Sequence, residues 1–268
     1  MKKLLAALAA ALMLAVFTVP AVNAQDDATI MLLHGIPDTD VDVVAGGEVA
    51  IAGFAFGDME DLSALAGTTL PGVQVVLAGT EDVAIDIGDL ALPDSGNTTI
   101  VAHLDAEGTP AVAVFTNDTS EIAAGEGRLT VRHAAAAPEV DILANGEVAF
   151  AAVPNGAEGV VDLPAGTITA EVVPAGATEP VVIGPAELPI AEGTSLIVYA
   201  VGSLEGETLQ VLTQSIEGLG SAPAAVNTGN SPVSQSGGLP VAALAGIALA
   251  GLAVVGVGGR RLAAVRRS

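Results

Sequence analysis

The residues with the clearest potential for chemistry are three aspartates, Asp38, Asp40 and Asp42, which are spaced two positions apart. Oxygen ligands at alternate positions begin the calcium loop of an EF-hand, which also needs a glycine at its sixth position and a glutamate at its twelfth. Counted from Asp38, those positions hold Val43 and Val49. We therefore expect ordinary turn and strand positions here, with calcium binding by the three aspartates as the alternative.

Two of the three histidines end short runs in which apolar residues alternate with others, as in a strand with one buried face. We expect the rings of His34 and His133 to hydrogen-bond the backbone of the neighbouring turn, or else Asp42 and Asp141, which follow at the same spacing. The four residues predict a structural corner that occurs twice. A zinc site needs three or four converging ligands, and His103 is the only other histidine.

Signals for catalysis are weak throughout the sequence. There is no cysteine, which excludes thiol nucleophiles, thiolate metal sites and disulfides. Ser, His and Asp all occur, but no serine stands in a G-x-S-x-G context, and no G-x-G-x-x-G follows a strand. We therefore expect no enzymatic activity and no cofactor, and a hydrolase ranks third among the hypotheses.

The elements that must position these residues repeat within the chain. Residues 133–149, HAAAAPEVDILANGEVA, align without a gap to residues 34–50, and eight of 17 positions are identical. A period near 100 residues predicts tandem domains rather than a solenoid. Each copy contains short alternating or β-branched runs separated by turn residues, and Asn145-Gly146 favours a type I′ hairpin turn.

Seven or eight such runs per copy predict an all-β fold of two tandem antiparallel, immunoglobulin-like β-sandwich domains, over residues 25–124 and 125–218. In the second copy we expect eight strands: Leu129–His133, Glu139–Ala144, Glu147–Ala151, Gly159–Leu163, Thr167–Val173, Val181–Ile183, Ser195–Gly202 and Thr208–Thr213.

Both ends of the chain are apolar. Residues 1–24 begin with two lysines, continue with an apolar run and end in Val22-Asn23-Ala24, and so are typical of a cleaved signal peptide. Residues 239–259 carry no charge and, as a helix, are long enough to cross a bilayer. The arginines of 260–268 follow at once, which places this tail in the cytoplasm by the positive-inside rule. We expect a single-pass protein of the cell membrane whose bulk is extracytoplasmic.

Charge is divided unevenly along the chain. All 31 acidic residues lie in residues 25–238 with only two basic residues, Arg128 and Arg132, so this body has a formal charge of −29. Such a surface disfavours nucleic acid and anionic lipid as partners. Residues 219–238 are rich in Gly, Ser, Asn and Pro and are typical of a flexible stalk. The expected partners are the membrane, through the C-terminal helix, and an envelope protein or cations.

The repeated pattern resembles the DUF4397 domain of bacterial surface proteins. It consists of a strand ending in His, a turn with Pro, a V-D-[VI] strand, a small turn with Gly, and a later L-P-A-G-T. The second copy carries it most completely, in Val131–Ala134, Pro138, Val140–Ile142 and Leu163–Gly176. The first copy has Gly35 in place of Ala134 and lacks the proline of that later segment. The resemblance covers about 190 residues as two copies. It implies an extracytoplasmic β-sandwich and no known activity.

These observations favour a non-enzymatic cell-surface protein with a structural, adhesive or ligand-presenting role. The alternative is an extracytoplasmic calcium- or small-ligand-binding module of a sensing assembly. The two differ in whether the domains contain a site for a small ligand.

Overall fold

Short runs of Val, Ile, Leu and Thr between Gly, Pro, Asn and Asp fold residues 28–221 into sixteen β-strands joined by turns and loops. These are the residues that the structure, a computed structural model, describes. The predicted signal peptide, membrane span and basic tail lie outside them, as does most of the predicted stalk. The one helical element within them is the single turn η1 (Ser63–Leu65). Over this range no helix has the length and apolar character needed to cross a membrane.

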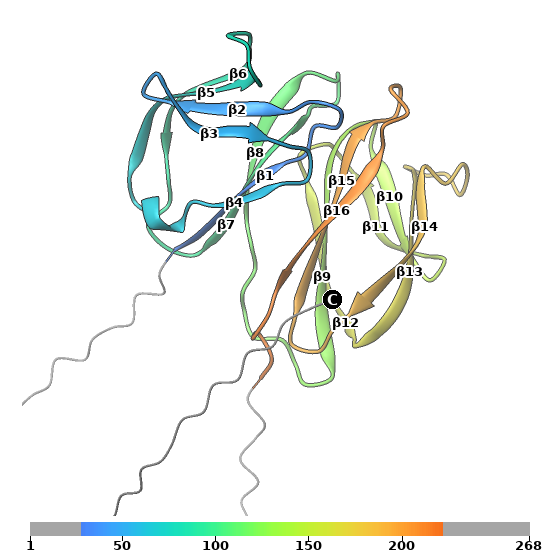
Figure 1. Cartoon of the computed structure of the whole chain (residues 1–268). Coiled ribbons are helices and arrows are strands. Elements are labelled where there is room, and N and C mark those ends of the chain that lie inside the picture. The colour runs from blue at the N-terminus through green and yellow to red at the C-terminus, as the bar shows by residue number, and fades with distance from the viewer. Residues whose placement is uncertain (1–27, 222–268) are drawn as a thin grey trace, which may run out of the picture. The chain divides into compact units, whose positions relative to one another are not determined.

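The first sandwich contains eight strands. They are β1 (Thr29–His34), β2 (Val41–Ala45), β3 (Glu48–Phe54), β4 (Met59–Asp61), β5 (Thr69–Leu77), β6 (Val83–Ala91), β7 (Asn97–Leu104) and β8 (Pro110–Thr116). They form two four-stranded sheets, in the orders β4-β1-β7-β8 and β3-β2-β5-β6 (Figure 1).

The second sandwich also contains eight strands. They are β9 (Glu126–Ala136), β10 (Val140–Ala144), β11 (Glu147–Val153), β12 (Glu158–Pro164), β13 (Gly166–Pro174), β14 (Ile183–Ile190), β15 (Ser195–Ser203) and β16 (Gln210–Ile216). Their orders, β12-β9-β15-β16 and β11-β10-β13-β14, repeat those of the first sandwich strand for strand. The internal sequence repeat is therefore a repeat of topology.

The hairpin turn shows how local sequence sets this topology. Asn145 and Gly146 have φ of 53° and 82°, and Gly46 and Gly47 have 61° and 82° at the same place in the first sandwich. Two successive positive φ values define the type I′ turn, whose twist matches that of the flanking strands. The turn fixes the pairing of β2 with β3 and of β10 with β11.

The strands are not all antiparallel, which corrects the sequence-based expectation. β1 pairs with β7 in parallel, and β9 pairs with β15 in parallel. A parallel pair needs a long crossover connection, which is usually a helix. Here the strands between β1 and β7 provide it, because most of them belong to the opposite sheet. The other strand pairs within residues 28–221 are antiparallel.

The strand predicted at Val181–Ile183 overlaps the observed strand β14 at only one residue, Ile183. β14 begins at Ile183 and runs to Ile190 although it contains Pro185 and Pro189. It forms an edge of its sheet, where a residue without an N–H can leave the outer side unpaired. The two prolines made this segment look unlike a strand in the sequence, but prolines are tolerated in a strand at the edge of a sheet.

The two central strands of one sheet of the second sandwich, β9 and β15, are buried on both faces. All residues of β9 after its first are buried, as are all of β15 before its last. One face of each strand packs inside the second sandwich. The other face joins a cluster that includes Leu33, Val101 and Phe115 of the first sandwich with Ile197 and Tyr199 of β15. The two sandwiches therefore share a hydrophobic core.

Arg132 lies in this shared core with its side chain fully buried. Its guanidinium donates from Nε to Glu158 at 2.8 Å, from Nη1 to the Tyr199 hydroxyl at 2.8 Å, and from Nη2 to Asn117 Oδ1 at 2.7 Å. The guanidinium carbon also lies 4.4 Å from the centre of the Phe115 ring. A buried charge is tolerated only when it is paired and hydrogen-bonded, and Arg132 meets both conditions.

Replacing Arg132 by Met should lower the free energy of unfolding by about 3 kcal/mol, because Glu158, Tyr199 and Asn117 would all lose a charged donor. Urea unfolding followed by circular dichroism measures this change. Arg132→Lys is the matched control. It keeps the charge but not the planar fork, so we expect an intermediate loss. A Met variant as stable as the native chain would contradict this role.

Candidate functional site

Asp42 and Asp141 occupy equivalent positions in the two sandwiches, and each accepts two hydrogen bonds from backbone N–H groups. Asp42 accepts hydrogen bonds from the N–H of Gly53 at 2.7 Å and of Gly79 at 3.3 Å. Asp141 accepts from the N–H of Ala152 at 2.7 Å and of Gly176 at 2.8 Å. These bonds hold the pKa of Asp141 below its usual value. Each carboxylate thus ties β2 or β10 to the bulge of the next strand and to a more distant turn.

The three aspartates considered for calcium do not form a cluster. Within residues 28–221, no three His, Asp or Glu side chains lie close enough together to hold a metal ion. Both carboxylate oxygens of Asp42 already accept backbone N–H groups, and Asp38 has the positive φ of a turn, 57°. The spacing of Asp38, Asp40 and Asp42 therefore reflects a turn followed by a pinned strand.

The two histidines of the predicted corner are buried, but they bond to backbone carbonyls rather than to the aspartates. His34 Nε2 lies 2.7 Å from the Thr39 carbonyl oxygen, and His133 Nδ1 lies 2.9 Å from that of Val153. A neutral ring has one N–H to donate to such an oxygen. The other ring nitrogen of each is buried with no hydrogen-bond partner among the described residues. At each corner the histidine and the aspartate therefore bond to different backbone groups and not to each other.

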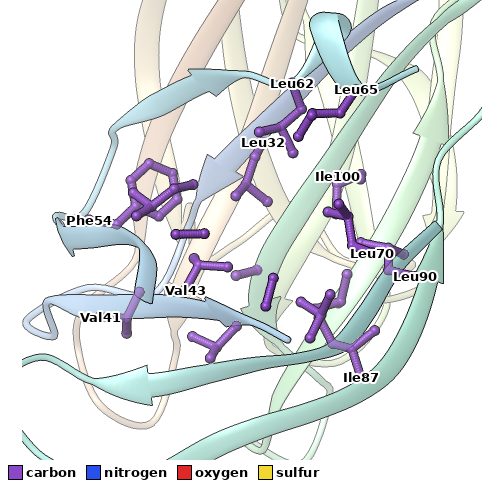
Figure 2. A pocket seen from close by; sticks show the side chains of 17 residues that line it. Leu32, Val41, Val43, Phe54, Leu62, Leu65, Leu70, Ile87, Leu90 and Ile100 are labelled. Carbon is purple, nitrogen blue, oxygen red and sulfur yellow. The ribbon is translucent and has the colours of Figure 1, made fainter. Parts of the chain in front are cut away.

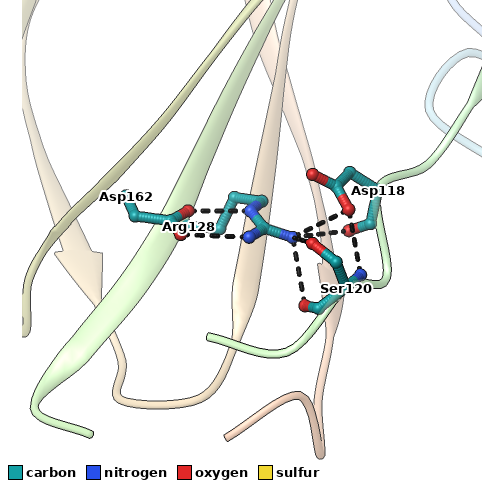
Figure 3. Close-up of polar contacts among 4 residues, drawn as sticks. All are labelled: Asp118, Ser120, Arg128 and Asp162. Atoms are coloured by element: carbon teal, nitrogen blue, oxygen red, sulfur yellow. Dashed lines mark hydrogen bonds and ion pairs between the residues drawn. The ribbon is translucent and has the colours of Figure 1, made fainter. Parts of the chain in front are cut away.

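Arg128 holds the connection between the sandwiches against β9 and β12 (Figure 3). Its Nε and Nη2 donate to the two oxygens of Asp162 at 2.7 and 3.0 Å. Its Nη1 contacts the carbonyl oxygen of Ser120 at 3.2 Å and the carboxylate of Asp118 at 3.0 Å. Arg128 is 4% exposed. All three guanidinium nitrogens therefore bond within the protein, which is the geometry of a structural clamp.

An apolar cavity of about 180 Å³ lies between the two sheets of the first sandwich (Figure 2). All 17 side chains that line it are Ala, Val, Leu, Ile or Phe. They come from both sheets and from η1, and include Leu32, Val43, Leu65, Leu70, Leu90 and Ile100. The cavity separates the core of this sandwich into one cluster around Ile30 and Ile100 and another around Val41 and Phe54.

The cavity reaches the solvent. Leu65 on η1 is 40% exposed, and Ala50 on β3 is exposed as well. Leu32, Leu70 and Leu90 are only half-buried, although they lie between the sheets. Apolar side chains in a sandwich interior are normally closed off from water. Their exposure here marks an accessible apolar site.

The second sandwich places a larger side chain in the equivalent space. In the second sandwich, Phe150 of β11 pairs with Ile142 of β10. In the first sandwich, Ile51 pairs with Val43 at the same place, so the larger Phe ring takes the position of Ile51. The ring needs Gly159 beside it, because a Cβ there would lie 2.4 Å from its atoms. The position of Gly159 in the first sandwich is taken by Glu60. The second core is accordingly one continuous cluster.

Sequence reasoning did not identify this cavity. None of its lining residues has a type or spacing that predicts chemistry. A signal was nevertheless present in the alignment of the two copies, which places Ile51 against Phe150 and Glu60 against Gly159. Its meaning depends on knowing that these two positions are neighbours across two sheets.

Residues 28–143 match the family described as "Domain of unknown function (DUF4397)". The match covers the whole first sandwich with β9 and β10 of the second, so it shows one copy of the domain. No curated protein matches the chain. The description of the family assigns no activity.

Acid should destabilise the protein through its histidines. Burial lowers the pKa of His34, His103 and His133 below the usual 6.5, although Asp40 and Asp58 near His34 and Asp105 near His103 partly oppose the shift. The unfolded chain therefore binds more protons than the folded chain below pH 6.5. Stability is complete above that pH and falls as the pH decreases toward the folded pKa values, by up to about 1.4 kcal/mol per pH unit for each histidine.

Urea midpoints at pH 7.5 and 5.5 test this expectation. Burial of the rings, rather than repulsion between surface charges, causes this loss of stability. The loss should therefore persist in 0.5 M NaCl, where the Debye length is roughly 4 Å and exposed charges are screened from one another. Stability that is constant or higher at pH 5.5 would contradict it.

Proposed function

Starting from a domain family with no assigned activity, we propose that this chain is a non-enzymatic, membrane-anchored surface protein whose first sandwich binds a small apolar ligand. The observation that carries the proposal is the open apolar cavity between the sheets of that sandwich. The proposal combines two hypotheses from the sequence: a surface protein that presents a ligand, and a module that binds a small ligand. The second sandwich is the supporting domain.

The size and lining of the cavity support a ligand rather than trapped water. Water in a protein needs two to four polar partners, and the side chains that line this cavity offer none. An engineered apolar cavity of roughly 150 Å³ in another protein stays dry and binds benzene. At about 180 Å³, the cavity here accommodates a ring or chain of similar or slightly larger size.

The comparison between the copies supports selection for an open site. Filling a cavity commonly stabilises a protein by about 1 kcal/mol. The second sandwich achieves this with only two residues, Phe150 and Gly159, on the same topology. The first sandwich keeps Ile51 and Glu60 at those positions and leaves apolar side chains exposed to solvent.

Benzene should bind in the first sandwich and leave the second unchanged. In methyl NMR spectra of the full chain in lipid nanodiscs, we expect the δ1-methyl signals of Ile51, Ile87 and Ile100 to shift with saturation. Those of Ile168 and Ile190 in the second core serve as internal controls. Unchanged signals from the lining residues up to the solubility of benzene would refute the proposal.

The double variant Ile51→Phe/Glu60→Gly is the matched control, because it transplants the residue pair that fills the second sandwich. We expect it to lose benzene binding and to gain about 1 kcal/mol of stability. Retained binding with an unperturbed fold would place the ligand somewhere other than the cavity.

The proposed anchor has its own test. Deleting residues 239–268 should release the folded body into the medium, because the apolar, uncharged segment 239–259 is then missing. Fractionation of the culture measures the distribution. A truncated chain that remains in the membrane fraction would contradict anchoring by this segment.

A further inference from the structure

Because the cavity lining offers no polar partner, any charged or polar part of a ligand has to remain at the mouth. Moving a charge into an apolar space without a partner costs several kcal/mol or more. The residues near the opening therefore determine which ligand heads are accepted. This reasoning rests on the proposed function, since it concerns the same cavity.

Glu60 stands on the cavity side of the sheet edge. It pairs directly with Leu32 across the β1–β4 ladder, and paired residues project from the same face of a sheet. It is also two residues before Leu62, the residue that precedes η1. Leu32 and Leu62 both line the cavity, whereas Glu60 is exposed. The register therefore places Glu60 beside the cavity opening, next to two of the lining residues labelled in Figure 2, Leu32 and Leu62.

Within residues 28–221, no exposed basic side chain is available to receive an anionic head. Arg128 and Arg132 are the only basic residues in residues 28–221, and they are 4% and 0% exposed. Their guanidinium groups bond to Asp162, Glu158 and other protein groups. The described part of the chain is otherwise acidic, because all of the 31 acidic residues except Asp26 and Asp27 lie within residues 28–221. A carboxylate or phosphate head at the mouth would meet repulsion from Glu60 and no counter-charge from the described residues.

We propose that the first sandwich binds small apolar molecules with a positively charged head, such as alkylammonium compounds. The apolar chain lies in the cavity, and the head stays at the mouth near Glu60. A neutral head is accepted with lower affinity, and an anionic head is disfavoured. Glu60 has a second role in keeping the cavity open, because the glycine at its position in the second sandwich is what admits the ring of Phe150.

Three six-carbon probes that differ only in their head test this proposal: hexylammonium, 1-hexanol and hexanoate. Affinities come from the δ1-methyl shifts of Ile51, Ile87 and Ile100 in the full chain in uncharged-lipid nanodiscs, with free ligand fixed by dialysis. An exposed charge pair changes affinity by a few-fold. We expect hexylammonium to bind roughly threefold more tightly than 1-hexanol, and hexanoate at least threefold more weakly.

Glu60→Gln should bring hexylammonium close to 1-hexanol while the affinity for 1-hexanol itself stays the same. Glu205→Gln changes the net charge equally at an exposed position in the second sandwich, and it should leave the order unchanged. High salt should also reduce the difference between the heads.

The possible failures are distinct. If 1-hexanol and benzene bind but hexanoate equals hexylammonium, the charge preference is refuted and the proposed function stands. If the preference survives in Glu60→Gln, Glu60 is not its source, and this assignment is overturned. If none of the probes shifts the lining methyl signals, the proposed function fails together with this inference.

Discussion

The arrangement of the described residues depends on burying the guanidinium of Arg132 between two sandwiches. Its donors are used by β12, by β15 and by the connection between the sandwiches, while Phe115 of β8 covers its face. No single sandwich supplies all of these partners. The charge can be accommodated only when both are folded and in contact, and so the interface is specified by polar geometry as well as by apolar area.

This burial explains which parts of the fold the sequence could predict. Strand positions followed from turn residues and alternation, and seven of the eight strands expected in the second copy overlap the observed ones closely. Alternation also placed Leu129 and Val131 on one face of β9 correctly. Alternation puts Thr130 and Arg132 on the opposite face, and it does not indicate that this face is buried as well, with the two residues 4% and 0% exposed. A polar residue on the second face of a strand looks the same in sequence whether water or another domain covers it.

The cavity of the first sandwich was less predictable for a related reason. Chemistry is visible in a sequence when polar residues have a characteristic spacing, which is why His34 and the aspartates attracted attention first. A cavity is a property of volume, and it depends on which residues meet across two sheets. Ile51 and Glu60 are nine positions apart in the chain. The pairing of β3 with β2 and of β4 with β1 is needed to see that these two positions are neighbours. In the second sandwich they hold Phe150 and Gly159, and the ring packs against the glycine.

The two buried arginines have a further consequence for how the protein resists proteases. Trypsin-like proteases cut after lysine or arginine and need that residue in an exposed, flexible segment. Residues 28–221 contain no lysine, and both of their arginines lie inside strand β9 with their side chains bonded within the protein. The folded body therefore presents no cleavage site to this class of enzyme. For the same reason it presents no amine to reagents that acylate lysine.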